Sequence, residues 1–181
     1  MSNDAIIKVV SVIGNSDSGK TTLLEKVIAE LKHRGYRVGV IKHTYRDCEI
    51  DQPGKDTWRY TQAGSNIVAL SSPAQLAIIE HLDRESGLAD IVGLLEGKVD
   101  IILTEGYKDS ATAKVLVRGN EGQAVPSFTG ESLAIVSPSV APNGVMHFAH
   151  EDVARIVDLM IEYLATGHAS GERIQLSTRL Y

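Results

Sequence analysis

The stretch between residues 6 and 24 constrains the fold more than any other part of the chain. An apolar, β-branched run ends at Gly14, four small polar residues follow, and Gly19, Lys20 and Thr21 open an apolar pattern with helical spacing. This is the pattern GxxxxGK[ST] between a strand and a helix, the phosphate-binding P-loop. A Gly/Ser turn beside an exposed lysine is the plainer interpretation, but it does not explain the strand and helix on either side. The stretch therefore predicts an α/β protein that holds a nucleoside triphosphate.

Each residue type in this motif has a chemical role. Glycine at positions 14 and 19 allows backbone angles that a Cβ would oppose, and the loop N–H groups then point at phosphate oxygens. We expect Lys20 to act as a catalytic point charge on the β- and γ-phosphates and the Thr21 hydroxyl to ligate Mg²⁺. The predicted phosphate-binding residues are Gly14, Asn15, Ser16, Asp17, Ser18, Gly19, Lys20, Thr21 and Thr22.

Composition excludes several other classes of protein. The net charge of −5 argues against a general nucleic-acid surface. The single cysteine, Cys48, excludes a cysteine-based zinc cluster and fits a reducing compartment. The longest apolar runs are strand-sized, and the first residues do not resemble a signal peptide. We therefore expect a cytoplasmic protein that contacts neither membrane nor nucleic acid.

Hydrophobic periodicity predicts alternating strands and helices in one domain over residues 1–165, followed by a tail, 166–181, that is disordered or contacts a partner. The expected fold is a P-loop NTPase three-layer sandwich, with a mostly parallel sheet and an antiparallel edge hairpin. Residues 75–81 fit the second arm of this hairpin, and a helix over residues 75–83 is the alternative. The expected strands are 6–13, 36–41, 66–71, 100–104, 114–118, 133–137 and 145–148, and the expected helices begin in the P-loop and at 56, 88 and 151.

Polar side chains follow several of the predicted strands, where ligands of open α/β sheets bind. Lys42 and His43 end the second strand and are expected to face the nucleotide, although His43 also suits a plain strand cap. Glu105 ends a buried strand, as the carboxylate of a Walker B element does, and is predicted to serve Mg²⁺ or the attacking water. Asp51, in the long acidic loop, is a further catalytic candidate, with a solvated loop acid as the alternative.

Three other residues receive structural interpretations from the sequence. Asp56 is expected to cap the helix that follows it. His147 and His150 precede the last predicted helix, and we interpret both as surface residues.

Three segments together resemble the MobB family, molybdopterin-guanine dinucleotide biosynthesis protein B, over residues 6 to about 164. They are GNSDSGKTTLLEKVIAEL, VGVIKHTYRDCEIDQPGKDTWRYTQAG and DIILTEGYK. The resemblance implies GTP bound on a P-loop fold with Mg²⁺ at Thr21 and Glu105, and Lys42, His43 and Asp51 facing the nucleotide. It also implies weak GTPase activity and a homodimer. The implied role is that of an adaptor to the MobA-type guanylyltransferase, the enzyme that joins GMP to molybdopterin. Molybdopterin is a further candidate ligand.

One departure from the family pattern concerns guanine. Many relatives carry Ser-Asp where this chain has Ser137-Pro138, and the [NT]KxD guanine motif is absent. Preference for guanine therefore follows from the resemblance alone, with Ser137 in the loop 136–139 as the expected point of contact.

Two alternative functions fit the sequence less well. A small P-loop kinase would close a lid with arginines over the phosphates, and Arg46, Arg59 and Arg118 do not form a cluster in the sequence. A metal-delivery GTPase would carry His- or Cys-rich tracts, whereas this chain has six scattered histidines. A slow GTPase needs only phosphate binding, Mg²⁺ and a poorly placed water, and the sequence favours it.

Overall fold

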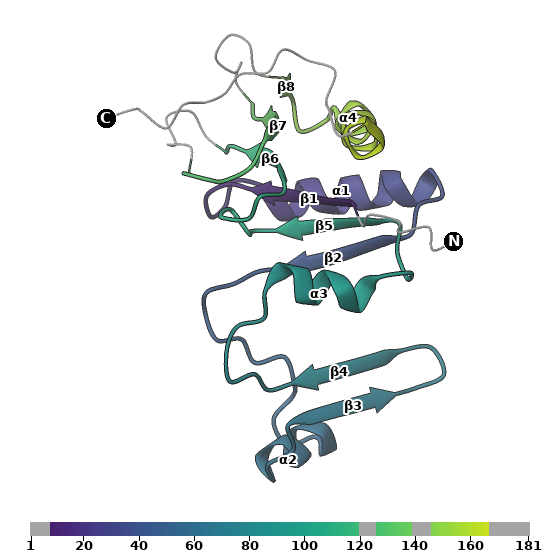
Figure 1. Ribbon diagram of the computed structural model, residues 1–181, viewed down its shortest axis with the longest axis vertical. Helices are drawn as coiled ribbons and strands as arrows, with labels where there is room; N and C mark the ends of the chain where they lie inside the picture. Colours follow the sequence, from purple (N-terminus) through teal and green to yellow (C-terminus); the bar gives the residue numbers. More distant parts are fainter. Residues whose placement is uncertain (1–7, 120–125, 139–145, 167–181) are drawn as a thin grey trace. The chain divides into compact units, whose positions relative to one another are not determined.

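A parallel sheet of six strands forms the main part of the protein in a computed structural model, which describes residues 8–119, 126–138 and 146–166. Its strands are β1 (Lys8–Ile13), β2 (Val38–Lys42), β5 (Ile101–Glu105), β6 (Ala113–Val117), β7 (Ser132–Val136) and β8 (His147–Phe148). They lie in the order β2-β5-β1-β6-β7-β8 (Figure 1). Every neighbouring pair is parallel, so the carboxyl ends of the strands meet at one edge.

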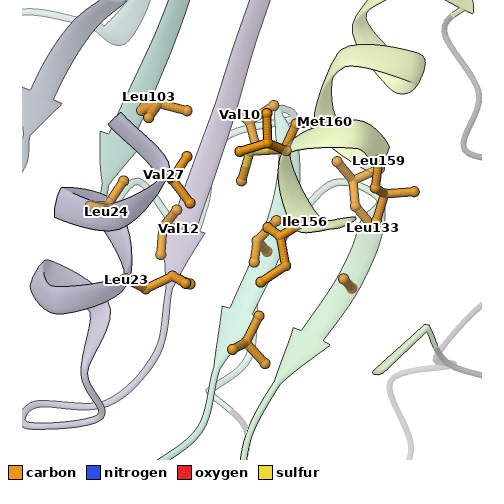
Figure 2. Close-up of a cluster of buried hydrophobic side chains, with 14 of the residues drawn as sticks. Val10, Val12, Leu23, Leu24, Val27, Leu103, Leu133, Ile156, Leu159 and Met160 are labelled. Carbon is orange, nitrogen blue, oxygen red and sulfur yellow. The ribbon is translucent and has the colours of Figure 1, made fainter. Parts of the chain in front are cut away.

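Two helices, α1 (Lys20–His33) and α4 (Val153–Thr166), pack on one face of this sheet. Leu23, Leu24 and Val27 of α1 meet Val10 and Val12 of β1 (Figure 2). The apolar stripe of α4 approaches β7 in the same way. Each large apolar side chain removed from water contributes on the order of 1.5–3 kcal/mol, so this core fixes α1, and with it the P-loop, against β1.

The opposite face of the sheet is also covered. Leu95 of α3 (Leu88–Leu95) lies over Gly39, where an added Cβ would come within 3.2 Å of the leucine Cδ1. Farther along, Ile13, Leu116 and Ile135 form a second apolar cluster with Phe128. Helices on both faces of a parallel sheet give the expected three-layer α/β fold.

The chain divides into two compact units, residues 1–43 with 91–181, and residues 44–90. The second unit contains α2 (Asp56–Gln62), β3 (Ile67–Ser71) and β4 (Leu76–Glu80). β3 and β4 pair antiparallel as a sheet of their own, so β4 is the second arm of the hairpin and not a helix. The predicted antiparallel hairpin is thus present as a sheet separate from the parallel one. This division was not evident in the sequence, because polar residues run continuously across position 44.

Other elements follow the sequence prediction within about two residues. The last helix begins at Val153, two residues beyond the expected start. Asp56 is not the cap of α2, because Lys55 occupies that position and no side chain caps the helix. Asp56 is instead an acid of the first turn, with its Oδ1 3.7 Å from Arg59 Nη1. Residues 6 and 7, residue 145 and the tail after Thr166 lie outside the described residues. Within the described ranges, no helix is long and apolar enough to cross a membrane.

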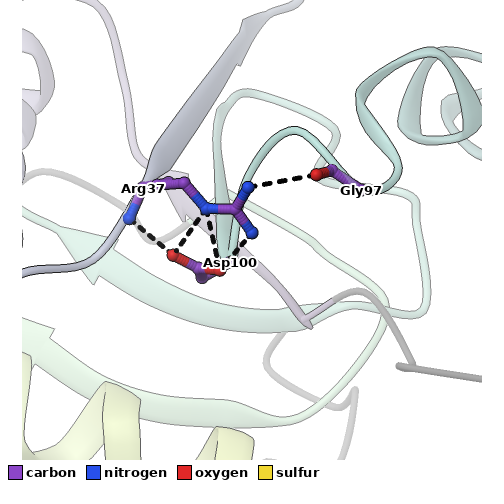
Figure 3. A network of polar contacts seen from close by, with 3 residues as sticks. All are labelled: Arg37, Gly97 and Asp100. Carbon is purple, nitrogen blue, oxygen red and sulfur yellow. Dashed lines mark hydrogen bonds and ion pairs between the residues drawn. The ribbon is translucent and has the colours of Figure 1, made fainter. Parts of the chain in front are cut away.

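Arg37 and Asp100 join β2 to β5 at the amino end of the sheet (Figure 3). The guanidinium donates to both carboxylate oxygens, at 2.6 Å from Nη2 and 3.1 Å from Nε to Oδ1, and at 3.2 Å from Nε to Oδ2. The Arg37 N–H donates to Asp100 Oδ2 at 2.7 Å, and Arg37 Nη1 donates to the Gly97 carbonyl at 3.1 Å. These hydrogen bonds lower the pKa of Asp100. The pair clamps the amino ends of two neighbouring strands.

Candidate nucleotide-phosphate site

A pocket of about 510 Å³ opens at the carboxyl edge of the parallel sheet. Its volume falls in the range of small-molecule sites, roughly 300–1,000 Å³. The pocket is lined by Ser16, Asp17, Gly19, Lys20, Thr21, Thr22, Lys42 and Glu105. Every one of these residues was predicted from the sequence to belong to the site, and they come from three segments far apart in the chain.

The backbone of the P-loop leaves no room for larger residues. A Cβ on Gly14 would lie 2.2 Å from the Val117 carbonyl oxygen, so only glycine fits. Asp17 has a φ of 58° and Gly19 one of 91°, left-handed angles that turn the loop into α1. Since α1 begins at Lys20, the N–H groups of its first turn have no partner within the helix and point at the pocket.

A buried hydroxyl supports an anion in this loop. Ser18 Oγ is buried and has no hydrogen-bond partner among the described residues. An unsatisfied buried donor is costly, and a phosphate oxygen would satisfy it. Together with the N–H groups in the first turn of α1, this hydroxyl fits a polyphosphate.

The charged side chains of the site converge from three elements. Lys20 Nζ donates to the Asn15 carbonyl at 2.5 Å, which holds the ammonium across the loop. Thr21 Oγ1 donates to Glu105 Oε2 at 3.2 Å, and Lys42 Nζ lies 3.4 Å from Glu105 Oε1. Lys42 and Glu105 are register partners of β2 and β5. The structure therefore brings Glu105 to the P-loop threonine, while its role toward Mg²⁺ or the attacking water stays a prediction.

The hydroxyl and carboxylate oxygens of Thr21 and Glu105 are ligand types that Mg²⁺ prefers. In the described part of the chain, no group of three His, Cys, Asp or Glu side chains could hold a metal ion. A Mg²⁺ at Thr21 and Glu105 would therefore take its other ligands from phosphate and water, as Mg²⁺ sites commonly do. The residues present fit a Mg²⁺–nucleotide complex rather than a metal bound by protein alone.

His43 and Tyr107 lie beside this site. Their rings stack with centroids 4.5 Å apart. The His43 N–H donates to the Glu105 carbonyl at 2.9 Å, which joins the ends of β2 and β5. Gly106 makes room for His43: its φ is 100°, and a Cβ there would approach the histidine Cβ to 3.2 Å. The structure thus places His43 next to Glu105, although the pocket lining does not include it.

Asp51 belongs to the unit 44–90, whereas the P-loop belongs to the other unit. Its Oδ1 accepts hydrogen bonds from the Gln52 N–H at 2.8 Å and from Thr57 Oγ1 at 3.0 Å. Its Oδ2 is buried with no hydrogen-bond partner among the described residues. The carboxylate therefore tethers the acidic loop to α2 while one oxygen remains available, and its catalytic role stays a prediction.

Ser137 ends β7 at the same edge of the sheet, but its polar groups bond to β8. Its N–H donates to the Phe148 carbonyl at 3.1 Å, and its hydroxyl lies 3.1 Å from His147 Nε2. His147 is accordingly half-buried rather than a surface residue. A contact between Ser137 and a nucleobase stays a prediction, and residue 139 of that loop lies outside the described residues.

The sequence interpretation missed His150. Its Nε2 lies 3.2 Å from the point that a Cβ on Gly19 would occupy, so the imidazole rests against the P-loop. His150 follows β8 by two residues. Ligands of open α/β sheets bind beyond the carboxyl ends of the strands. Applying this rule to the short predicted strand as well as to the longer ones would have identified His150.

Comparison with known proteins agrees with this geometry. Residues 9–138 match the family model of MobB, described as molybdopterin guanine dinucleotide synthesis protein B. The chain belongs to the MobB family. A relative in Escherichia coli K12, named molybdopterin-guanine dinucleotide biosynthesis adapter protein, is 31% identical over 170 residues, which span 91% of this chain and 97% of that protein. A relative of the same name in Haemophilus influenzae is 38% identical over 116 residues, covering 64% of this chain and 65% of that protein.

Solved MobB structures share the fold. A crystal structure of molybdopterin-guanine biosynthesis protein B superposes with a TM-score of 0.72 at 29% identity, over 87% of this chain and 99% of the other. The structure of Bacillus subtilis MobB gives a TM-score of 0.72 at 25% identity, over 86% of this chain and 97% of that one. The matched range 9–138 includes every residue that lines the pocket.

Proposed function

We propose that this chain binds GTP with Mg²⁺, hydrolyses it slowly, and serves as an adapter to a MobA-type guanylyltransferase in making molybdopterin guanine dinucleotide. The observation that carries the proposal is the convergence of Thr21, Glu105 and Lys42 on the P-loop pocket. The names of the relatives support the pathway. The assignment of GTP as the ligand and of the guanylyltransferase as the partner rests on the family resemblance.

The pocket residues suit binding better than rapid chemistry. The N–H groups of the P-loop and the Lys20 ammonium would hold the phosphates, while Thr21 and Glu105 would hold Mg²⁺, which supplies positive charge to the β- and γ-phosphate oxygens. Fast GTPases add an arginine finger and a glutamine that orients water. Neither residue type lines the described pocket. A site of this kind retains GTP long enough to present it to another protein.

The proposal is tested by measuring GTP and ATP affinity with Mg²⁺ for wild type, Lys20→Ala and Lys26→Ala. Lys26 is an exposed lysine on the same helix and serves as the matched control. We expect GTP to bind more tightly than ATP, and only Lys20→Ala to lose affinity, by roughly 10–100-fold, about 1.4–2.7 kcal/mol. Unchanged GTP binding in folded Lys20→Ala would overturn the phosphate assignment. Equal or tighter ATP binding would contradict the guanine assignment, and transfer to a small acceptor faster than to water would indicate a kinase.

The homodimer that the resemblance implies has a candidate surface on the hairpin. Cross-strand partners share a face, and one face carries Ile67, Leu76 and Ile78, each more than half exposed. The other face carries the buried Val68, and α2 packs beside β3. An isolated two-stranded sheet is marginally stable, so covering this face with a second copy would stabilise it.

Light scattering at several protein concentrations tests this arrangement. We expect wild type and Leu82→Lys to be dimeric and Ile78→Lys to be monomeric, because Leu82 is an exposed apolar residue outside both strands. A dimeric, folded Ile78→Lys variant would exclude this face as the dimer interface.

The proposed location is the cytoplasm. Cys48 is free and exposed, as suits a reducing compartment.

A further inference from the structure

Lys114 is a buried lysine that the proposed function leaves unexplained. It lies in the middle of β6 with no exposed surface, and it is among the largest fully buried side chains of the described residues. Lysine is almost never fully buried, because removing an ammonium group from water is costly unless every N–H finds an acceptor. Its hydrogen bonds should therefore reveal what the residue does.

The Lys114 ammonium is bonded to four oxygen atoms of one short segment. Nζ donates to the carbonyl and the hydroxyl of Ser110, at 2.8 and 2.9 Å. The carbonyl and the hydroxyl of Thr112 also lie within hydrogen-bonding distance of Nζ, at 2.9 and 2.6 Å, so the three N–H groups of the ammonium are shared among four acceptors. The side chain thus folds the connection between β5 and β6 back onto β6. A lysine with no such segment to hold would instead extend to solvent.

The Thr112 hydroxyl also joins the segment between β5 and β6 to the sheet beside the site. Thr112 Oγ1 lies 2.6 Å from Ser11 Oγ, and Thr104 Oγ1 donates to Ser11 Oγ at 2.8 Å. Ser11 is the register partner of both Thr104 and Lys114. A polar row therefore crosses β5, β1 and β6 at the residue immediately before Glu105.

The segment held by Lys114 leads to the aromatic pair at the site. Ser110 donates to the Tyr107 carbonyl through both its N–H, at 3.1 Å, and its hydroxyl, at 2.8 Å. Tyr107 has a φ of 53°, an uncommon angle for a large residue. That backbone places its ring on His43, whose N–H bonds the Glu105 carbonyl.

We infer that Lys114 is a positioning residue that fixes the turn 106–112, and through Tyr107 and His43 holds Glu105 and Lys42 in place for the Mg²⁺–nucleotide complex. The identity of the ligand in this inference rests on the proposed function, whereas the hydrogen bonds of Lys114 do not depend on it. Lys114 is not among the residues that line the pocket. Losing its ammonium should therefore weaken the metal-dependent part of binding and spare the contacts of the phosphates with the P-loop.

The first test needs no nucleotide. Amide hydrogen exchange is measured on Lys114→Met, Lys98→Met and wild type. Lys98 is an exposed lysine at the other end of β5, where its Nζ donates to the Leu94 carbonyl. We expect exchange over residues 106–112 to quicken by about tenfold or more in Lys114→Met, while amides of α1 keep wild-type rates. Wild-type exchange across 106–112, or equal acceleration in α1, would overturn the positioning role.

The second test compares GTP affinity in excess Mg²⁺ with GTP affinity in a chelator. We expect Lys114→Met to lose roughly tenfold in affinity with Mg²⁺ and to remain within about twofold of wild type without it. Equal losses under both conditions would indicate a general loss of structure and refute the inference. Ser110→Ala removes the hydroxyl that Lys114 binds and leaves the lysine in place. It should therefore show weaker forms of both the faster exchange and the loss of Mg²⁺-dependent affinity. This variant replaces Lys114→Met in both tests if Lys114→Met does not fold. If Lys20→Ala binds GTP normally, the proposed function fails while the exchange experiment still decides the role of Lys114.

Discussion

The two ends of β5 carry two carboxylates that differ in burial and in how closely they are hydrogen-bonded. Asp100 at the amino end accepts four hydrogen bonds from Arg37, the shortest at 2.6 Å. Glu105 at the carboxyl end has a hydroxyl at 3.2 Å and an ammonium at 3.4 Å, although its side chain is only 15% exposed. The more buried acid therefore has the looser contacts. Burial without short, complete pairing is typical of a group arranged for a ligand rather than for stability.

The surroundings of the two acids also differ. At the amino end, the Arg37–Asp100 pair joins two strands directly, and the Arg37 side chain is more than half exposed. At the carboxyl end, Gly14, Gly106 and the left-handed Tyr107 bring backbone close to backbone. Conformations of this kind cost free energy and cluster at functional sites. The four predictions that follow test this contrast in order of decreasing effect.

Gly14→Ala should cause the largest change. Its Cβ would lie 2.2 Å from the Val117 carbonyl oxygen, so the P-loop must shift away from β6. We expect a loss of about 3 kcal/mol in the free energy of unfolding, measured by urea denaturation, together with loss of nucleotide binding. Gly93→Ala is the control, since a Cβ there meets nothing within 4 Å. A Gly14→Ala variant as stable as wild type would show that the loop does not need this close approach.

Lys114 should make stability depend on alkaline pH. Burial lowers the pKa of Lys114 to about 8, from 10.5 in the unfolded chain, and nearby Asp109 opposes this shift. Between these two values the unfolded chain holds a proton that the folded protein has released, so the free energy of unfolding rises with pH. We expect wild type to gain up to about 3 kcal/mol relative to Lys114→Met from pH 8 to 10.5. Parallel pH profiles of the two proteins in urea denaturation would contradict a charged, buried Lys114.

Glu105→Gln should affect binding more than folding. The amide keeps the shape and the contact with Thr21 but removes the charge that would face Mg²⁺. We expect Mg²⁺ to enhance GTP affinity roughly 10–100-fold less than in wild type, with little change in thermal midpoint. Isothermal titration with and without Mg²⁺ measures both quantities. If the variant keeps the full Mg²⁺ effect, Glu105 is not a metal ligand.

Asp100→Asn should have the smallest effect. The pair with Arg37 is exposed and screened by solvent, so its contribution to stability is small. The pKa of Asp100 is lowered, so whatever stability it adds is present at neutral pH and is lost as the pH falls through that lowered value. We expect unchanged nucleotide binding and a slight fall in thermal midpoint at pH 7. A loss of binding as large as that of Glu105→Gln would erase the distinction between the two ends of β5.

Most of the parallel sheet could be predicted from the sequence because buried parallel strands are continuous apolar runs. The runs around Val10, Leu103 and Ile135 are of this kind. The separate unit 44–90 could not, because its boundary crosses a long polar loop. The hairpin strands also expose apolar residues, so their pattern shows pairing but not independence from the main sheet.

The site was predictable where the residue type itself carries the chemistry. The P-loop, Lys42 and Glu105 were found because a motif or a strand end marks them. His150 was missed because it follows a strand of only two residues, which gives a weak periodic signal. Lys114 was invisible for a different reason: a lysine within an apolar strand looks like a solvated edge residue. Only its contacts with Ser110 and Thr112 show that it points inward.

The register of the sheet limits how this site can change over evolution. Lys42, Glu105 and Val12 lie in one row across β2, β5 and β1, so each site residue is fixed by its count from the start of its strand. One residue inserted before this row in any of these strands would turn the following side chains to the opposite face. Insertions after His43 would leave this row untouched, whereas insertions in the turn 106–112 would break the contacts of Ser110 and Thr112 with Lys114. Length variation among related chains should therefore accumulate after His43 and be absent from these strands and from the turn 106–112.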